Sequence, residues 1–254
     1  MIYLVDYKSD IIQNYITQAS KNPFATRVKG LLNAYGEYNG LCDVWYQLVD
    51  DNITGYIVRY GGEFIADIQS GADFEEIINM CRIAGGTALL CKRINMGGMV
   101  GDVMRLIDLK SNNIQPSCDY TFSDNVNLYE YYDILKANKS ESFAVPEFED
   151  FYVDLNHRLR KNTAHIVGLY SNEKLISCSV ATALDKTSAV IAGVATLPQY
   201  KKQGYGTAVV TELCKQLTYK NITDIFLQRD KNENFNFYKN IGFENISEFE
   251  QIIL

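Results

Sequence analysis

Gly204 and Gly206 follow two lysines, Lys201 and Lys202, at the junction of an apolar run and an amphipathic one. The run before them, residues 189–196, is rich in β-branched and small apolar residues and predicts a strand that stops at a proline. After the glycines, apolar residues recur every few positions, which predicts a helix lying on a sheet. Such a turn aims free backbone N–H groups and the positive end of a helix dipole at one point. The sequence therefore predicts an anion site suited to a phosphate.

Two familiar phosphate turns fit this segment poorly. A P-loop requires a lysine after its last glycine, where this chain has Thr207. A Rossmann fingerprint requires a third small residue, where Val209 stands, and an acidic residue at the end of the next strand. Asp230 meets the second requirement, but too little chain follows it to complete a doubly wound sheet. From the turn alone, a strand-to-helix connection without a ligand stays an equal alternative.

A second motif lies in residues 232–243, which are rich in asparagine and aromatic residues. The apolar spacing predicts a short helix, and Gly242 supplies the left-handed residue that commonly ends one. The segment closes with the pattern Tyr238-x-x-x-Gly242-Phe243. This short helix is separated from the glycine turn by one predicted helix and one predicted strand. Its order and spacing narrow the choice of phosphate ligand.

Together the two segments resemble the GCN5-related N-acetyltransferase (GNAT) superfamily. Its members carry a Gln/Arg-x-x-Gly-x-Gly/Ala turn after the fourth strand of the fold, and then an asparagine-rich helix that ends in Tyr-x-x-x-Gly-Phe. Here the turn reads Lys201-x-x-Gly204-x-Gly206, and Lys201 departs from the usual Gln or Arg, although lysine can also contact a phosphate. The resemblance covers about residues 118–254 and is strongest over 188–243.

The resemblance implies an α/β (α+β) fold, in which a mixed, twisted sheet is flanked by helices, and acetyl-CoA as co-substrate. Backbone N–H groups of the turn would hold the pyrophosphate, and the end of the preceding strand would pair with the pantetheine arm. The residues implied to bind the coenzyme are Val194, Ala195, Thr196, Lys201, Lys202, Gln203, Gly204, Tyr205, Gly206, Thr207, Asn232 and Asn234.

The resemblance also implies direct transfer in a ternary complex. A backbone N–H at the strand end would stabilise the oxyanion, and the hydroxyl of Tyr238 would protonate the leaving thiolate. The alternative for Tyr238 is a packed aromatic residue, in a chain with 18 tyrosines. Many relatives carry a glutamate base on the fourth strand, but residues 188–196 contain no carboxylate. The remaining candidates for a base, with water as a relay, are His157, Asp154, Glu147, Glu149 and Asp185.

The chain is longer than one GNAT domain by about a hundred residues, which leaves room for a second small domain. Residues 42–68 predict a three-stranded meander, 73–83 a helix and 87–92 a strand, in the order that the C-terminal part also shows. We therefore expect a degenerate GNAT-like copy over 1–112, without a phosphate turn, and a coenzyme-binding domain over 118–254. The alternative is an unrelated small α/β domain at the N-terminus.

Two shorter segments are predicted to be irregular. The polar stretch 111–117 contains a proline and is the expected linker between the two domains. The glycine cluster 97–101 is expected to be a turn.

Composition limits the class of protein. The chain is 47% hydrophobic and has no apolar stretch of the roughly 20 residues that a membrane helix needs, so we expect a folded cytoplasmic protein. Six cysteines form no C-x-x-C pair, which favours reduced, buried thiols and gives a metal site no support. A net charge of −7 without a basic stripe argues against nucleic acid as a partner. Both a monomer and a homodimer stay open.

The acceptor is expected to meet the segments 127–135 and 141–150, which are rich in acidic and aromatic residues. Such a surface suits the primary amine of a small molecule or peptide, because carboxylates attract an ammonium group and aromatic faces can stack over it. The alternative is a solvated acidic loop with inward-facing aromatic rings. Two other functions stay open: a non-catalytic acyl-CoA sensor or scaffold, and a tandem acyl or aminoacyl transferase that acts on cell-wall precursors.

Overall fold

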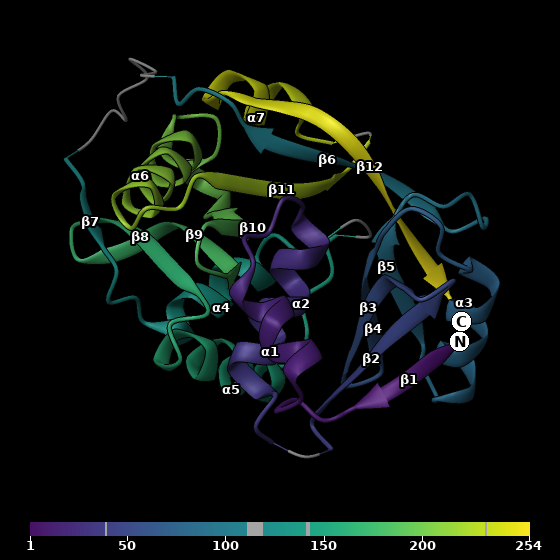
Figure 1. Ribbon diagram of the computed structural model, residues 1–254. Coiled ribbons are helices and arrows are strands. Elements are labelled where there is room, and N and C mark those ends of the chain that lie inside the picture. Colours follow the sequence, from purple (N-terminus) through teal and green to yellow (C-terminus); the bar gives the residue numbers. More distant parts are fainter. Residues whose placement is uncertain (39, 111–118, 141–142, 232) are drawn as a thin grey trace.

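The computed structural model describes all residues except 39, 111–118, 141–142 and 232 (Figure 1). The expected linker at 111–117 therefore lies outside the described residues, as do Asn232 of the predicted coenzyme set and the first two residues of the segment 141–150. We call residues 1–110 the N-terminal half and residues 119–254 the C-terminal half.

The two halves repeat one order of elements. The N-terminal half contains β1 (Ile2–Val5), α1 (Asp10–Thr17), α2 (Pro23–Tyr35), β2 (Cys42–Val49), β3 (Asn52–Tyr60), β4 (Glu63–Ile68), α3 (Phe74–Ile83), β5 (Ala88–Lys92) and β6 (Met99–Leu106). The C-terminal half contains β7 (Thr121–Ser123), α4 (Leu128–Lys136), α5 (Phe148–Arg160), β8 (His165–Ser171), β9 (Lys174–Leu184), β10 (Ser188–Thr196), a short 3₁₀ turn (Pro198–Tyr200), α6 (Tyr205–Tyr219), β11 (Asp224–Asp230), α7 (Phe235–Ile241) and β12 (Phe243–Ile253). Among the described elements, α7 has no counterpart in the N-terminal half.

All these strands join in one sheet, in the order β1-β2-β3-β4-β5-β12-β6-β11-β10-β9-β8-β7. The last strand of each half lies between strands of the other half. β12 is antiparallel to both β5 and β6, while β6 is antiparallel to β11 on its other side. Figure 1 shows β12 in yellow, running from beside β6 to the N-terminal part of the sheet. The two halves thus exchange their last strands. The sheet is mixed, because β10 pairs parallel with β11 and β4 pairs parallel with β5, which confirms the expected fold class.

Most of the locally predicted elements are confirmed. The meander over 42–68 is β2, β3 and β4, the helix over 73–83 is α3, and the strand over 87–92 is β5. The helix after the glycine turn is α6, and Gly242 ends α7 with a left-handed φ of 118°. Alternating burial and turn residues at the ends of these segments are local signals, so they can be recognised without knowing the partners.

The interpretation of residues 97–101 as a turn is wrong in its second part, because residues 99–101 begin β6. Gly101 lies in this central strand, where a Cβ atom would lie 2.2 Å from the ring of Phe249 and 2.5 Å from the backbone oxygen of Arg229. The glycine is required by the close approach of β11 and β12 rather than by a turn. Both neighbours are more than a hundred residues away in sequence, so no local pattern reveals them.

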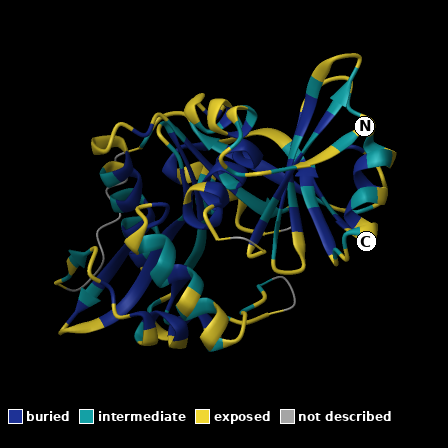
Figure 2. Ribbon diagram, turned by 60° about the horizontal axis from the view of Figure 1, so that its bottom comes forward, coloured by how far each residue is buried: buried dark blue, intermediate teal, exposed yellow. Residues whose placement is uncertain are grey.

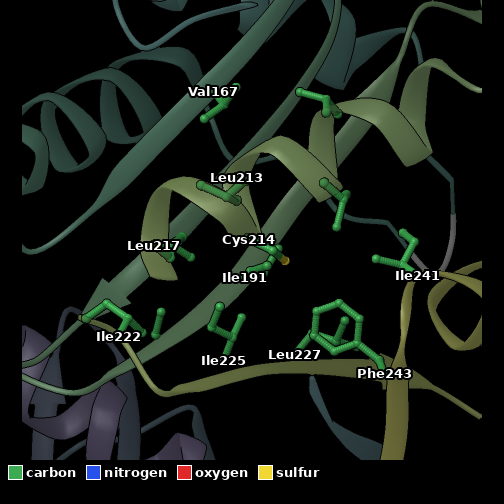
Figure 3. Packing of buried hydrophobic residues seen from close by; sticks show 14 of the residues in the cluster. Val167, Ile191, Leu213, Cys214, Leu217, Ile222, Ile225, Leu227, Ile241 and Phe243 are labelled. Atoms are coloured by element: carbon green, nitrogen blue, oxygen red, sulfur yellow. The ribbon is translucent and has the colours of Figure 1, made fainter. Parts of the chain in front are cut away.

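Helix α6 covers one face of the C-terminal part of the sheet. Its residues Leu213, Cys214 and Leu217 point at Ile191 and at the side chains of β11, and all are almost fully buried (Figure 3). The side chains of Ile241 and Phe243, from the end of α7 and the start of β12, close this cluster. The glycine turn that precedes α6 is therefore held by a large apolar core.

Helix α2 lies on the opposite face and contacts strands of both halves. Phe24 clusters with Val103 of β6 and Phe249 of β12, and Gly30 lies so close to β9 that an added Cβ would be 3.3 Å from the Cβ of Ala183. In Figure 2 the central strands are mostly buried, and the exposed residues gather in loops and on outer helix faces. The helix thus holds the two halves against each other.

The state of the cysteines and the lengths of the helices match what the composition predicted. The five cysteines within the described chain are buried and unpaired, as expected, and burial raises the pKa of the Cys214 thiol to about 12. None of the described helices combines the length and apolarity that crossing a bilayer would require.

One buried carboxylate fixes the loop between β5 and β6. Glu250 of β12 accepts hydrogen bonds from the backbone N–H groups of Ile94, Asn95, Met96 and Gly98, at 2.7–2.9 Å. Burial acts to raise the pKa of Glu250, but these four donors outweigh it, and the pKa lies below its usual range. This contact joins the last strand of one half to the loop that replaces α7 in the other.

We predict that Glu250→Gln lowers the free energy of unfolding by about 2 kcal/mol or more at neutral pH, because an amide cannot accept four N–H groups. The folded pKa is depressed, so the stabilisation is complete above the unfolded pKa of about 4.3 and is lost as pH falls through the folded value. Denaturant unfolding should therefore show a difference between wild type and variant that shrinks under acid conditions. The control Glu244→Gln, on an exposed part of β12, should change stability by less than about 0.5 kcal/mol. Equal effects of the two substitutions would contradict the role of Glu250.

Candidate functional site

Strands β10 and β11 separate part of the way along their length. They pair only from Ser188 with Asp224 to Ile191 with Leu227. Beyond this point β11 continues against β6, whereas β10 runs on to Thr196 with no described strand on that side. Free N–H and C=O groups on such an edge can pair with an extended ligand as if it were another strand.

The open edge begins at a bulge. The pairing of β10 with β9 shifts register between Ala192 and Ala195, and Gly193 has a left-handed φ of 58°. The hydroxyl of Tyr131, from α4, donates a 2.6 Å hydrogen bond to the carbonyl oxygen of Gly193. A Cβ atom on Gly193 would lie 2.2 Å from that hydroxyl. A glycine at position 193 therefore leaves room for the Tyr131 hydroxyl, and the hydrogen bond from Tyr131 fixes the backbone of the bulge.

The glycine turn follows the short 3₁₀ turn that comes after β10. Lys202 and Gly204 both have left-handed backbones, with φ of 61° and 89°, and Gly204 is the N-cap of α6. Among the described residues no side chain caps the helix at Gly204, where the positive end of the helix dipole lies. The side chains of Lys201, Lys202 and Gln203 are exposed beside this end of the helix. This geometry suits an anion at the start of α6.

Gly206 brings the strand end, α6 and α7 together. An added Cβ would lie 3.3 Å from Oγ1 of Thr196 and 3.5 Å from the ring of Phe237. Thr196 is fixed in turn, because its hydroxyl lies 2.8 Å from that of Ser177 and its carbonyl accepts from the amide of Asn138 at 3.0 Å. Thr196, the glycine turn and α7 therefore lie close together at the end of the open edge of β10.

Tyr238 lies on α7, with its ring packed edge-on against Phe237 and Phe243 at centroid distances of 4.9 and 6.0 Å. Burial raises the pKa of Tyr238 to about 12, and the nearby charge of Arg229 opposes this rise. The phenol therefore keeps its proton at neutral pH. Asn234 is the N-cap of α7, and its carbonyl accepts the backbone N–H of Tyr238 at 3.2 Å.

His157 lies elsewhere, in the contact between the halves. Its Nε2 lies 2.8 Å from the carbonyl oxygen of Ala34, and its ring stacks on Tyr35 at 4.6 Å and meets the edge of Tyr38. These three partners belong to α2 and the residues after it. The position gives His157 a structural role and no described contact with α7 or the open edge of β10.

The other candidate bases lie in three different places. Oδ1 of Asp185 accepts from the backbone N–H groups of Thr187 and Ser188, so this carboxylate holds the turn between β9 and β10. Glu147 is the N-cap of α5 and makes no side-chain cap bond. Asp154 and Glu149 line a cavity that also reaches Gly193.

This cavity has a volume of about 710 Å³ and lies between the bulge, the α4–α5 connection and the N-terminal half. Tyr131 and Gly193 line it from the C-terminal half, and Leu41, Tyr60 and Gly61 line it from the N-terminal half. Sequence reasoning placed an acceptor region near α4 and α5. The predicted segment 127–135 includes Tyr131, but nothing in the sequence indicated its contact with Gly193, and Leu41, Tyr60 and Gly61 were not assigned to the acceptor region.

The corresponding place in the N-terminal half is unsuited to a phosphate. The connection from β4 to α3 is only residues 69–73, and the carboxylate of Asp73 accepts the N–H of Glu76 at 3.0 Å. Glu75 and Glu76 add negative charge in the first turn of α3. The N-terminus of α3 therefore carries its own carboxylates, which would repel a phosphate.

The part of the chain with this geometry matches a known protein family. Residues 128–243 match the protein-family model described as the acetyltransferase (GNAT) family. No curated protein sequence matches the chain significantly.

Three solved structures show the extent of the similarity. A tandem GNAT protein from the clavulanic acid biosynthesis pathway is 10% identical, with a TM-score of 0.61 over 100% of this chain and 98% of that chain. An acetyltransferase from the GNAT family of Colwellia psychrerythraea is 14% identical, with a TM-score of 0.58 over 100% and 99%. A GCN5-related N-acetyltransferase from Kribbella flavida is 15% identical, with a TM-score of 0.57 over 78% and 85%.

At these identities the structural similarity shows the fold, while the family model identifies the part of the chain with the open edge of β10, the glycine turn and α7. Residues 128–243 match the model of the acetyltransferase (GNAT) family, within a chain that has the fold of tandem GNAT proteins over its whole length.

Proposed function

We propose that the chain transfers an acetyl group from acetyl-CoA to a primary amine. The observation that carries this proposal is the open edge of β10 beyond Gly193, which leads to the uncapped start of α6. An extended pantetheine arm fits the edge, and a pyrophosphate fits the N–H groups of the turn. The coenzyme set proposed from the sequence lies along this line over residues 194–207, with Asn234 at the start of α7.

The residues of the chain have separate tasks in this reaction. Bound acetyl-CoA would supply an acyl group as a thioester. The backbone at the bulge of β10 donates to the carbonyl oxygen as negative charge develops there. Tyr238 donates its proton to the sulfur as the C–S bond breaks and the C–N bond forms, and it recovers a proton from solvent. Because Cys214 is buried against β10 and β11 with a raised pKa, it is not a nucleophile (Figure 3), which favours direct transfer.

The proton released by the attacking amine requires an acceptor. Asp154 accepts hydrogen bonds from Tyr35 at 2.6 Å and from Arg158 at 2.8 Å, and these two contacts hold its carboxylate in one position. It lines the same cavity as Gly193 and is the carboxylate best fixed in position there. We assign it the proton, with water as the relay between amine and carboxylate.

A second function is an acyl-CoA sensor without catalysis. It is favoured by the absence of any carboxylate from β10, whose residues are apolar, small or hydroxylic. The two functions share the coenzyme site and differ only in the release of free thiol when an amine is added. Thiol release above the uncatalysed rate would exclude the sensor.

The coenzyme site is tested with Gly204→Asp. Calorimetric titration should show acetyl-CoA binding to wild type and at least about 100-fold weaker binding to the variant, because the new carboxylate stands where the pyrophosphate should lie. Gly85→Asp is the matched control, since Gly85 also has a left-handed backbone (φ 78°) but no neighbour within 4 Å of an added Cβ. Undiminished binding by the Gly204 variant, or no binding by wild type, would refute the site.

The proton donor is tested with Tyr238→Phe. We expect kcat to fall by about 10- to 100-fold, with little change in the Kd of acetyl-CoA, because only departure of the thiolate requires the proton. Tyr219→Phe, at an exposed position on α6, should leave both constants unchanged. A variant of Tyr238 that retains full kcat would show that the ring is a packing residue only.

The bulge is tested with Tyr131→Phe. Loss of the hydroxyl leaves the carbonyl of Gly193 without this donor, and should cost about 1–2 kcal/mol of stability. Turnover should fall by about 10-fold, because the backbone that faces the thioester is no longer fixed. The control Tyr15→Phe removes another buried tyrosine hydrogen bond, to Asp67 at 2.9 Å, and should reduce stability but not turnover. The same loss of turnover in both variants would contradict a local effect on the bulge.

A further inference from the structure

The cavity beside Gly193 has a chemical character that narrows the acceptor. Most of its wall is apolar, and its aromatic and aliphatic side chains come from α4, α5 and the segment between them. They include Tyr131, Leu135, Phe143, Val145 and Phe151, and Val180 of β9 adds to the same wall. A wall of this kind favours an apolar body and penalises a buried charge.

The N-terminal half supplies the remaining wall. Leu41 and Tyr60 line the cavity, and Leu41 is 46% exposed at its border. Tyr60 is held in place, because its ring stacks on Tyr35 at 4.5 Å and Arg158 lies over it at 5.5 Å. This wall belongs to the half that has no phosphate turn. That half therefore contributes to the acceptor cavity rather than to a phosphate site.

The charged residues of the wall are unbalanced. Three carboxylates, Glu149, Asp150 and Asp154, stand against one guanidinium, that of Arg158. Arg158 pairs with Asp154, so Glu149 and Asp150 have no ion pair among the described residues. Both lie in the first turn of α5, line the cavity and are exposed, so they form its acidic mouth. A cationic group is attracted here, whereas a phosphate or carboxylate on the ligand would be repelled.

Size completes the description. A volume of about 710 Å³ lies within the range of cavities that enclose small organic ligands. We infer that the acceptor is a small primary amine with one positive charge on an apolar, aromatic or alkyl body, and that Leu41 and Tyr60 of the N-terminal half help to select it. This inference rests on the proposed function.

The experiment uses the full chain, acetyl-CoA and three probe amines: phenethylamine, spermidine and glucosamine 6-phosphate. Free thiol is followed, and the Kd of acetyl-CoA is measured separately by calorimetry. We expect kcat/KM for phenethylamine to exceed that for the other two amines by at least about 10-fold, because spermidine places extra charges on the apolar wall and the phosphate meets the acidic mouth.

The contribution of the N-terminal half is tested with Leu41→Lys. This variant should lower kcat/KM for phenethylamine by about 10-fold or more and leave the Kd of acetyl-CoA unchanged. Leu4→Lys is the matched control, because Leu4 is also exposed but lies on β1, at the far edge of the sheet. It should change neither constant.

The outcomes separate the inference from the proposed function. If acetyl-CoA binds and phenethylamine is not acetylated, or if another probe is preferred, the inference is overturned and the coenzyme site stands. If Leu41→Lys behaves like Leu4→Lys, the role of the N-terminal half is overturned. If wild type binds no acetyl-CoA, the proposed function itself fails and the inference fails with it.

Discussion

The pairing of β6 with β12 at the centre of the sheet is the contact on which the rest of the structure depends. Each of these strands comes from one half and is flanked on its other side by a strand of the other half. If either strand were withdrawn, the other half would be left with an unpaired sheet edge at its core, which is costly and prone to aggregation. Close packing requires Gly101 at this point, and Glu250 fixes the loop beside it. The halves are therefore parts of one folding unit.

This central contact explains how a chain with one proposed coenzyme site can use two similar halves. The C-terminal half has the open edge, the uncapped helix and the half-buried phenol of Tyr238, and the N-terminal half has an acidic, capped helix at the corresponding place. The N-terminal half nevertheless supports the site from the other face. Helix α2 spans strands of both halves, and Tyr35 at its end binds Asp154 in the wall of the cavity. The N-terminal half therefore has a structural role that does not depend on binding a coenzyme itself.

The parts of the structure that could be predicted from the sequence are those with local causes. The glycine turn, the helix that it begins and the final Tyr-x-x-x-Gly-Phe pattern depend on backbone conformations and apolar spacings within a few residues. The family resemblance then implied a mixed, twisted sheet flanked by helices for the C-terminal half. Both steps needed only neighbouring residues, and the observed bounds of α6 and α7 agree with them.

The parts that could not be predicted depend on residues far apart in the chain. Gly193 gives no sign of the hydroxyl of Tyr131 that excludes a larger side chain, and the glycines near residue 100 give no sign of β12. His157 shows the same limit, because its stacking on Tyr35 depends on a contact between halves. The cavity beside the bulge is also formed from three distant segments, which is why its apolar wall and acidic mouth are visible only in the folded chain.

The exchange of last strands also has a consequence for synthesis and folding. Because β12 is made after every other described strand, the inner edge of β5 and one edge of β6 wait without partners while the whole C-terminal half emerges from the ribosome. The first half cannot complete its sheet as an independent domain during translation. Contacts between such distant strands form slowly, and exposed edges invite the wrong pairing while they wait. The same strand exchange that joins the two halves in the folded protein therefore makes wrong pairing most probable just before β12 leaves the ribosome.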